Sequence, residues 1–271
     1  MFMFLVNSGA IVIGSVALIR LYLNKSFKKC DSKQRLDGKT VLITGGNSGI
    51  GKQTAALLLQ RGAKVILACR DADSATRAID EINRNRTDEF GSAIFKQLDL
   101  NSFESVKRLV EDSPSRVVFV SSILYKYGDI RDIDLQPDQL NPGNYDIDKA
   151  YANSKLASVL YFRKLSKQME KKKIAVKMFC VSPGLVFTNI GRHMKLIWKI
   201  LLLPFAFLFL RTPKQGSQTT MYCVLEATEN GAYYRNCEKI PFAGKANDDN
   251  LASLVYDRTL AAIKAHCNTN Y

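Results

Sequence analysis

The distribution of apolar residues along the chain indicates an alternation of buried strands and helices. Five short apolar runs are typical of strands in a parallel sheet, and they cover residues 40–44, 64–69, 93–100, 116–122 and 175–183. Helical patterns occur at 52–63 and 148–169, and a helix at 213–230, capped by Gly231, precedes a last strand at 231–236. This alternation predicts an α/β fold built on a parallel sheet, and 271 residues suffice for its core.

The N-terminal segment 2–23 is apolar apart from Asn7, Ser8, Ser15 and Arg20. About 20 residues in a helix match the hydrocarbon thickness of a bilayer, and the arginine can snorkel at one end. A cleaved signal peptide is the alternative, but it requires a positive stretch before the apolar run and a small-residue cleavage site after it. Neither is present, so the segment predicts a transmembrane anchor.

Positive charges follow the apolar segment as Lys25, Lys28 and Lys29. By the positive-inside rule they predict a single-pass membrane protein whose main domain faces the cytosol. The chain then divides into a membrane anchor at 1–23, a basic juxtamembrane linker at 24–37 and one large domain at 38–271.

The net charge of +14 fits an anionic membrane surface better than nucleic acid, because the lysine clusters at 25–29 and 171–173 form no nucleic-acid-binding motif. The six cysteines lack metal-ligand spacing and the chain has only two histidines, so the sequence offers few ligands for a metal site. Scattered cysteines of this kind favour a reducing compartment.

A glycine-rich turn follows the first predicted strand and opens the helix at 52–63. Glycines let the backbone turn sharply and approach a pyrophosphate, while the helix directs its N-terminal amides at that charge. The next strand, at 64–69, follows at the spacing of a βαβ unit, which indicates a Rossmann-type doubly wound sheet. We expect cofactor contacts from Gly45, Asn47, Ser48, Gly49, Ile50 and Gly51.

Arg70 follows the second strand, where an acidic residue would favour the ribose 2′-hydroxyl of NAD. A guanidinium suits a 2′-phosphate, so the sequence favours NADP over NAD, although Asp71 and Asp73 are close by. Asp99 and Leu100 end the third strand on the ligand side of an open sheet and are further candidate cofactor contacts.

Tyr151 and Lys155 share one face of the helix at 148–169 because they are four residues apart. A lysine ammonium beside a phenol favours the phenolate, so this pair is a candidate acid/base. Ser122, at the end of the strand at 116–122, is a candidate to hold a carbonyl oxygen while the tyrosine gives or takes its proton.

The order TGGNSGIG, VSS, YANSK and VSPG resembles the short-chain dehydrogenase/reductase family, and more narrowly its membrane-anchored retinol dehydrogenase branch. The resemblance runs from about Gly38 to Cys237. It implies an NADP(H)-dependent alcohol dehydrogenase or carbonyl reductase acting on a retinoid or another lipophilic substrate at the endoplasmic reticulum. The resemblance assigns cofactor contacts also to Tyr151, Lys155, Pro183, Gly184, Val186 and Thr188. Tyr151 would be the acid/base, Lys155 would bind the nicotinamide ribose, and Ser122 would orient the substrate oxygen.

Such enzymes usually carry a strand ending in an NNAG-type turn, and a long helix, before the serine-ended strand. Here only Ser113-Pro114-Ser115 lies between a predicted helix ending near Glu111 and the strand at 116–122. The sheet would therefore be one central strand short. Either the sheet would split, or the strand at 116–122 would slide into the vacant place beside 40–44. We expect the slide, because an empty slot leaves two rows of backbone groups unpaired. The missing helix also makes an oligomer doubtful, because it often carries subunit contacts in the family.

Two rival interpretations remain open at this point. The segment 194–210 is either a core helix or an apolar flap that covers the substrate pocket and dips into the membrane surface. The chain as a whole is either an active reductase or a catalytically impaired, membrane-tethered isoform that binds nucleotide weakly or not at all.

Overall fold

The computed structural model of the protein describes residues 2–85, 91–102, 105–106, 116–130, 146–187 and 206–267. The predicted helix ending near Glu111 and most of the segment 194–210 lie outside these residues.

The first sheet is parallel and has the strand order β1 (Thr40–Thr44), β2 (Lys64–Cys69), β3 (Ser92–Gln97). Helices α2 (Gly49–Leu59) and α3 (Ala72–Arg84) connect the strands and pack on one face. On the other face the register aligns Leu42 with Ile66 and Ile94, and Leu42 and Ile94 are exposed.

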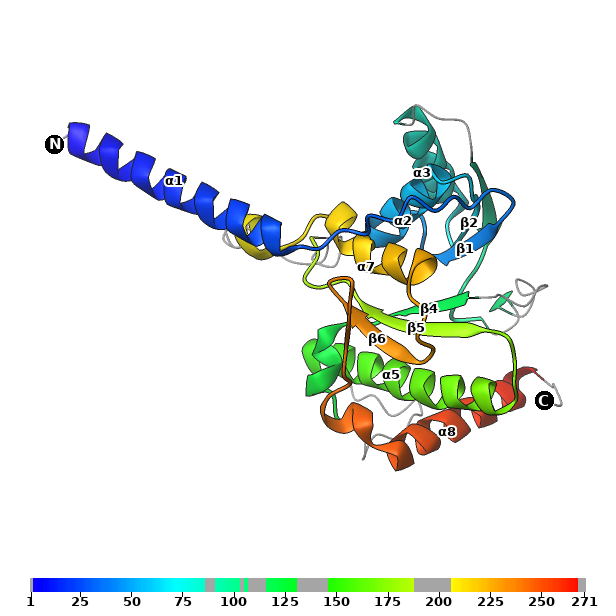
Figure 1. Ribbon diagram of the computed structural model, residues 1–271. Helices are drawn as coiled ribbons and strands as arrows, with labels where there is room; N and C mark the ends of the chain where they lie inside the picture. Colours follow the sequence, from blue (N-terminus) through cyan, green and yellow to red (C-terminus); the bar gives the residue numbers. More distant parts are fainter. Residues whose placement is uncertain are drawn as a thin grey trace.

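The second sheet has the order β4 (Arg116–Val120), β5 (Lys177–Ser182), β6 (Ala232–Arg235) and β7 (Glu238–Ile240). Its first three strands are parallel, and β7 returns antiparallel to β6. The long helix α5 (Ile147–Lys171) packs beneath it beside α8 (Asp249–Cys267), as Figure 1 shows. Two short 3₁₀ helices, η1 (Ile123–Tyr127) and η5 (Gly244–Asn247), complete this half.

The expected slide of the strand at 116–122 next to β1 is wrong, because β1 and β4 belong to different sheets. All five residues of β4 pair with β5, and Ser121 N–H donates to the carbonyl of Val181 at 2.7 Å. Val117 and Phe119 also pack into the core of the second sheet. Moving β4 to β1 would break this pairing and packing, so the sheet splits instead, as in the alternative.

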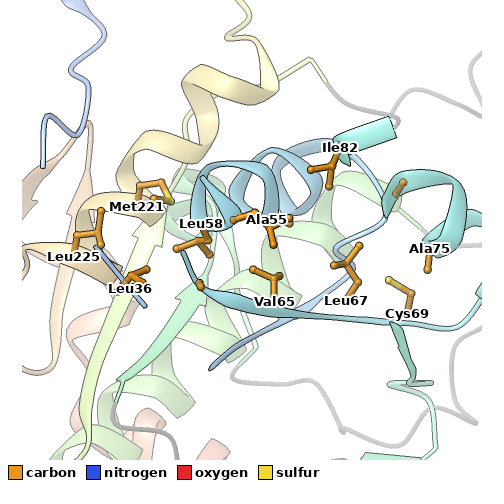
Figure 2. Close-up of a cluster of buried hydrophobic side chains, with 13 residues drawn as sticks. Leu36, Ala55, Leu58, Val65, Leu67, Cys69, Ala75, Ile82, Met221 and Leu225 are labelled. Atoms are coloured by element: carbon orange, nitrogen blue, oxygen red, sulfur yellow. The ribbon is translucent and has the colours of Figure 1, made fainter. Parts of the chain in front are cut away.

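Helix α7 (Pro213–Leu225) joins the two halves. It begins with a capping box, in which Thr212 and Gln215 each bond the other's backbone N–H. Met221 and Leu225 pack with Leu58 of α2 in the core of the first half (Figure 2). Cys223, on the same helix, packs in a cluster with strands of the second sheet. A single helix therefore contributes to the cores of both sheets.

Helix α1 (Phe2–Ser26) projects from the body in Figure 1 and runs three residues past the predicted anchor. Within the residues whose side chains the structure describes, which exclude 2–13, no helix is long and apolar enough to cross a bilayer. At the other end of the chain, α8 was not predicted. The predicted helix at 213–230 is also shorter than expected: it ends at Leu225, and Gly231, at φ +74°, lies immediately before β6 instead of capping the helix.

Candidate active site

The glycine-rich turn closes tightly between β1 and α2. Gly45 adopts φ +66° and donates its N–H to the carbonyl of Ala68 on β2 at 2.9 Å. A Cβ added at Gly51 would lie 2.5 Å from the carbonyl oxygen of Gly45, and one at Gly46 would lie 2.9 Å from Leu67 Cγ. The turn can form only with glycines at these positions, which leaves its backbone open to close approach by a ligand.

The N-terminus of α2 is built to face an anion. Ser48 is the N-cap in extended conformation, and among the described residues its side chain makes no capping hydrogen bond to the helix. Asn47 is held aside, because its amide donates to Ser74 Oγ at 2.8 Å. The first amides of the helix, from Gly49 and Ile50 onward, thus remain suited to phosphate oxygens, and the turn fits the pyrophosphate of a dinucleotide.

A pocket of about 370 Å³ opens at the carboxyl ends of β2 and β3. Its lining residues are Arg70, Gln97, Asp99, Ser102 and Ser105. The N–H of Asp99 donates to Ser105 Oγ at 3.0 Å, which shapes the wall of the pocket. Leu100, the neighbouring candidate, is exposed and does not line it.

Asp71 lies next to Arg70 but is engaged elsewhere. Its carboxylate caps α3 by accepting the N–H of Ser74 at 2.7 Å, and this bond lowers the pKa of the carboxyl. The charge of Asp71 is therefore directed at a helix N-terminus, where a carboxylate is stabilising. Arg70 is the cationic side chain among the described residues that line the pocket.

Tyr151 and Lys155 lie together on α5. The helix begins at an N-cap, Asp146, which accepts the N–H groups of Asp148 and Lys149 and so fixes the register of the pair. Lys155 Nζ lies 5.5 Å from the centroid of the Tyr151 ring. Burial lowers the pKa of the Lys155 ammonium, and its electrostatic interaction with the Cys180 thiol of β5 acts in the opposite direction.

Ser122 lies two residues after the end of β4 and is the N-cap of η1, where its Oγ accepts the N–H of Leu124 at 3.3 Å. The turn after η1 is fixed to α5, since the N–H of Asp129 donates to Asn153 Oδ1 at 2.7 Å. A Cβ on Gly128 would lie 2.8 Å from the carbonyl of Ala152. The end of β4 and the α5 turn that carries Tyr151 are thus joined by direct contacts, although the sheet has split.

The loop after β5 carries Pro183, Gly184 and Val186, while Thr188 lies outside the described residues. Gly184 has φ +83°, and a Cβ there would lie 3.0 Å from the guanidinium of Arg211. A Cβ on Gly216 of α7 would contact both Val186, at 2.6 Å, and Ile50 of the glycine-rich turn, at 3.4 Å. Helix α7 thereby brings the predicted cofactor contacts of the two halves together.

Sequence reasoning missed Arg211, a buried arginine that holds this loop. Its Nη1 donates to the carbonyl of Pro183 at 3.3 Å, its Nη2 donates to Asn236 Oδ1 at 3.0 Å, and the guanidinium lies 4.4 Å from the ring centroid of Phe27. Burial lowers the pKa of this guanidinium. One arginine after an apolar stretch carries no motif, so only the three-dimensional contacts reveal its role.

Several known proteins are similar to this chain. Residues 39–126 match the family model described as short chain dehydrogenase. Human "Retinol dehydrogenase 14" is 30% identical over an alignment of 292 positions, gaps included, that covers 82% of this chain and 85% of that protein. Bovine "Dehydrogenase/reductase SDR family member 13" is 32% identical, and the alignment covers 93% of this chain and 81% of the bovine protein.

Solved structures share the fold at low sequence identity. An uncharacterized protein from Mycobacterium paratuberculosis has a TM-score of 0.66 and is 20% identical, over 90% of this chain and 98% of that one. The L-sorbose reductase of Gluconobacter frateurii, solved with NADPH and L-sorbose, has a TM-score of 0.55 and is 16% identical, over 75% of this chain and 97% of that one. By fold and by sequence, the chain belongs to the short-chain dehydrogenase family and, within it, to the retinol dehydrogenase-like branch.

Proposed function

We propose that the protein is an NADP(H)-dependent oxidoreductase of the retinol dehydrogenase type, which moves hydride between nicotinamide and a retinoid or another lipophilic alcohol or carbonyl. The observation that carries this proposal is the Tyr151–Lys155 pair on α5, joined through η1 to the strand end that bears Ser122. The names of the relatives, human retinol dehydrogenases 14 and 11 among them, support the substrate class.

In this mechanism the residues of the chain bind the cofactor, orient the substrate and move a proton. The turn at Gly45–Gly51 and the amides of α2 hold the pyrophosphate, and the nicotinamide, when bound, donates or accepts the hydride. Tyr151 gives its phenolic proton to the substrate oxygen during reduction and takes it back during oxidation. Lys155 holds positive charge beside the phenol, and Ser122 orients the substrate oxygen.

The pocket at the ends of β2 and β3 supports the proposed preference for NADP. Arg70 lines it, while the neighbouring Asp71 is occupied in capping α3. A guanidinium pairs well with a phosphate, whereas an acidic residue in its place would favour the free ribose hydroxyl of NAD.

The cellular setting that we propose is a membrane, with α1 as a single-pass anchor and the remaining domain in the cytosol, at the endoplasmic reticulum. The apolar sequence 2–23 and the lysines that follow it support this arrangement. We also propose that the chain does not form the dimer typical of the family, since the helix that often carries those contacts has no counterpart in the sequence.

A second candidate function is a catalytically impaired, membrane-tethered isoform, and the split sheet favours it. Within the part of the chain that the structure describes, no strand lies between β1 and β4, and this position lies under the cofactor site of such sheets. The alignment with human retinol dehydrogenase 14 extends over 292 positions, more than the 271 residues of this chain, so that relative contains residues without a counterpart here.

Thermal melts of the full chain in detergent, with NADPH or NADH, followed by a retinaldehyde reduction assay, separate the candidates. NADPH at about 100 times its Kd should raise stability by about 2.7 kcal/mol and the melting temperature by about 5–10 °C. Tyr151→Phe should keep this shift and lower turnover by about 10²–10⁴-fold. A shift without turnover in the unaltered chain supports the impaired isoform, and no response to either nucleotide contradicts dinucleotide binding.

A further inference from the structure

Four exposed apolar side chains lie on the loop that follows Pro183 and Gly184 and on the neighbouring segment 206–210. We call them the apolar rim: Leu185, Phe187, Phe207 and Phe209. Leu185–Phe187 lies alongside the end of the 206–210 segment, because the N–H of Arg211 donates to the carbonyl of Leu185 at 2.7 Å. The N–H of Phe187 in turn donates to the carbonyl of Arg211 at 2.9 Å. Two chain segments thus place large apolar groups side by side in water, which marks an interaction surface.

Helix α1 is held against this rim. Arg20 Nη1 donates to the carbonyls of Leu208 at 2.9 Å and Leu210 at 3.0 Å, and the guanidinium lies 5.7 Å from the ring centroid of Phe207. These bonds satisfy carbonyls at the end of a helical turn, so Arg20 joins α1 directly to the segment 206–210.

The linker behind α1 is fixed to the same side of the domain. Gln215 Nε2 donates to Asn24 Oδ1 at 3.1 Å, and Phe27 stacks under Arg211. Asn236, in the turn between β6 and β7, donates to the carbonyl of Ser26 at 3.0 Å. The C-terminal end of α1, the linker and the rim are therefore joined by direct contacts on one side of the domain.

We propose that the apolar rim is a second bilayer-docking surface, which enters the interfacial region of the membrane that α1 occupies. Phenylalanine side chains are suited to that region, and lysines beside them attract anionic headgroups. Lys25 and Lys29 supply this charge at the junction of α1 and the linker, while Lys28 is paired with Glu238. The partner that fits is a phospholipid bilayer containing anionic lipid, because an apolar rim beside a basic linker is complementary to it.

Docking has a consequence for the substrate. The rim continues directly from Pro183 and Gly184, so docking places the loop that carries these predicted cofactor contacts at the bilayer surface. A retinoid dissolved in lipid can then enter without crossing water. This inference rests on the membrane attachment proposed above and not on catalysis.

The test places a single tryptophan on the rim or away from it. Trp198 is the only tryptophan, so Trp198→Phe provides a silent background in the full chain. Phe187→Trp probes the rim, at a residue 57% exposed, and Leu254→Trp on α8 is the control, at a residue 41% exposed. Figure 1 shows α8 on the side of the body away from α1. Both variants are reconstituted in phosphatidylcholine–phosphatidylserine vesicles, with or without bromine on the phosphatidylcholine acyl chains.

Brominated lipid should quench the Phe187→Trp protein about threefold more strongly than the Leu254→Trp protein, because only the rim reaches the acyl region. Equal, weak quenching of two proteins that sediment with the vesicles overturns the docking and leaves the anchor intact. Failure to sediment overturns both. Emission from Phe187→Trp that is blue-shifted, unquenched and dependent on protein concentration shows that a second copy covers the rim, which also overturns the proposal.

Discussion

Replacing Met221 by alanine tests whether α7 is what holds the two sheets together. Met221 is 2% exposed and packs against α2 in the core of the first half. Truncating a buried methionine to alanine costs about 2–5 kcal/mol, because apolar area is lost and a cavity remains. For a domain of this size that corresponds to a fall of about 5–15 °C in the melting temperature. The loss should fall on the contact between α7 and the first sheet.

Met178→Ala is the matched control, since Met178 is also 2% exposed but packs only in the core of the second sheet. Hydrogen exchange followed by mass spectrometry should show faster exchange in β2 for Met221→Ala, with β5 much less affected. Met178→Ala should show the reverse. Equal acceleration of both strands in both variants would refute the idea that α7 couples two separate cores, because a single continuous core would distribute the damage.

Three further outcomes follow from contacts at the site and its borders. Arg70→Gln should weaken NADPH binding by about 10–100-fold and leave NADH binding nearly unchanged, because the substitution removes a contact that only the 2′-phosphate of NADPH makes. Titration with each nucleotide measures the ratio of the two dissociation constants. Asn236→Ala should expose the linker to limited proteolysis, since it removes the bond to Ser26 and places alanine at φ +55°. Asn236→Asp also removes that donor, but it keeps an acceptor for Arg211 and adds a negative charge beside it. The hydrogen bond from Lys167, with Arg163 nearby, lowers the pKa of Asp249. The stabilisation of the fold by this carboxylate is therefore present above the unfolded pKa and is lost as the pH falls through the folded pKa. Thermal melts from about pH 6 to about pH 3 should show a smaller fall in melting temperature for Asp249→Asn than for the unaltered chain.

The local parts of the site could be predicted from the sequence. The turn at Gly45–Gly51 requires glycine at position 51 because a side chain there would meet the backbone of Gly45, so the local sequence predicts this part of its shape. Tyr151 and Lys155 are four residues apart on one helix, and helix geometry alone places them together. Neither inference depends on how distant strands pair.

The parts that failed depend on such pairing. The slide of β4 was expected from the cost of an empty slot, but β4 already satisfies one edge with β5 and buries Val117 and Phe119 there. That competing packing cannot be read from a five-residue run. The role of Arg211 likewise comes from Phe27, Pro183 and Asn236, which are remote from it in sequence.

The split sheet makes cofactor binding a test of the whole architecture. In the proposed mechanism, NADPH contacts the glycine-rich turn of the first half and the Tyr151–Lys155 pair of the second. Helix α7 joins these halves near Gly216, where Val186 and Ile50 meet. A ligand that binds only the correctly assembled halves must stabilise that assembly, by thermodynamic linkage.

NADPH should therefore slow hydrogen exchange in both β2 and β5 of Met221→Ala, and its affinity for this variant should be lower than for Met178→Ala. Exchange and nucleotide titration on the same two proteins measure both quantities. If NADPH protects β2 alone, the nucleotide binds the first half without the second, Tyr151 is not brought to the cofactor, and the impaired isoform becomes the better account of the chain.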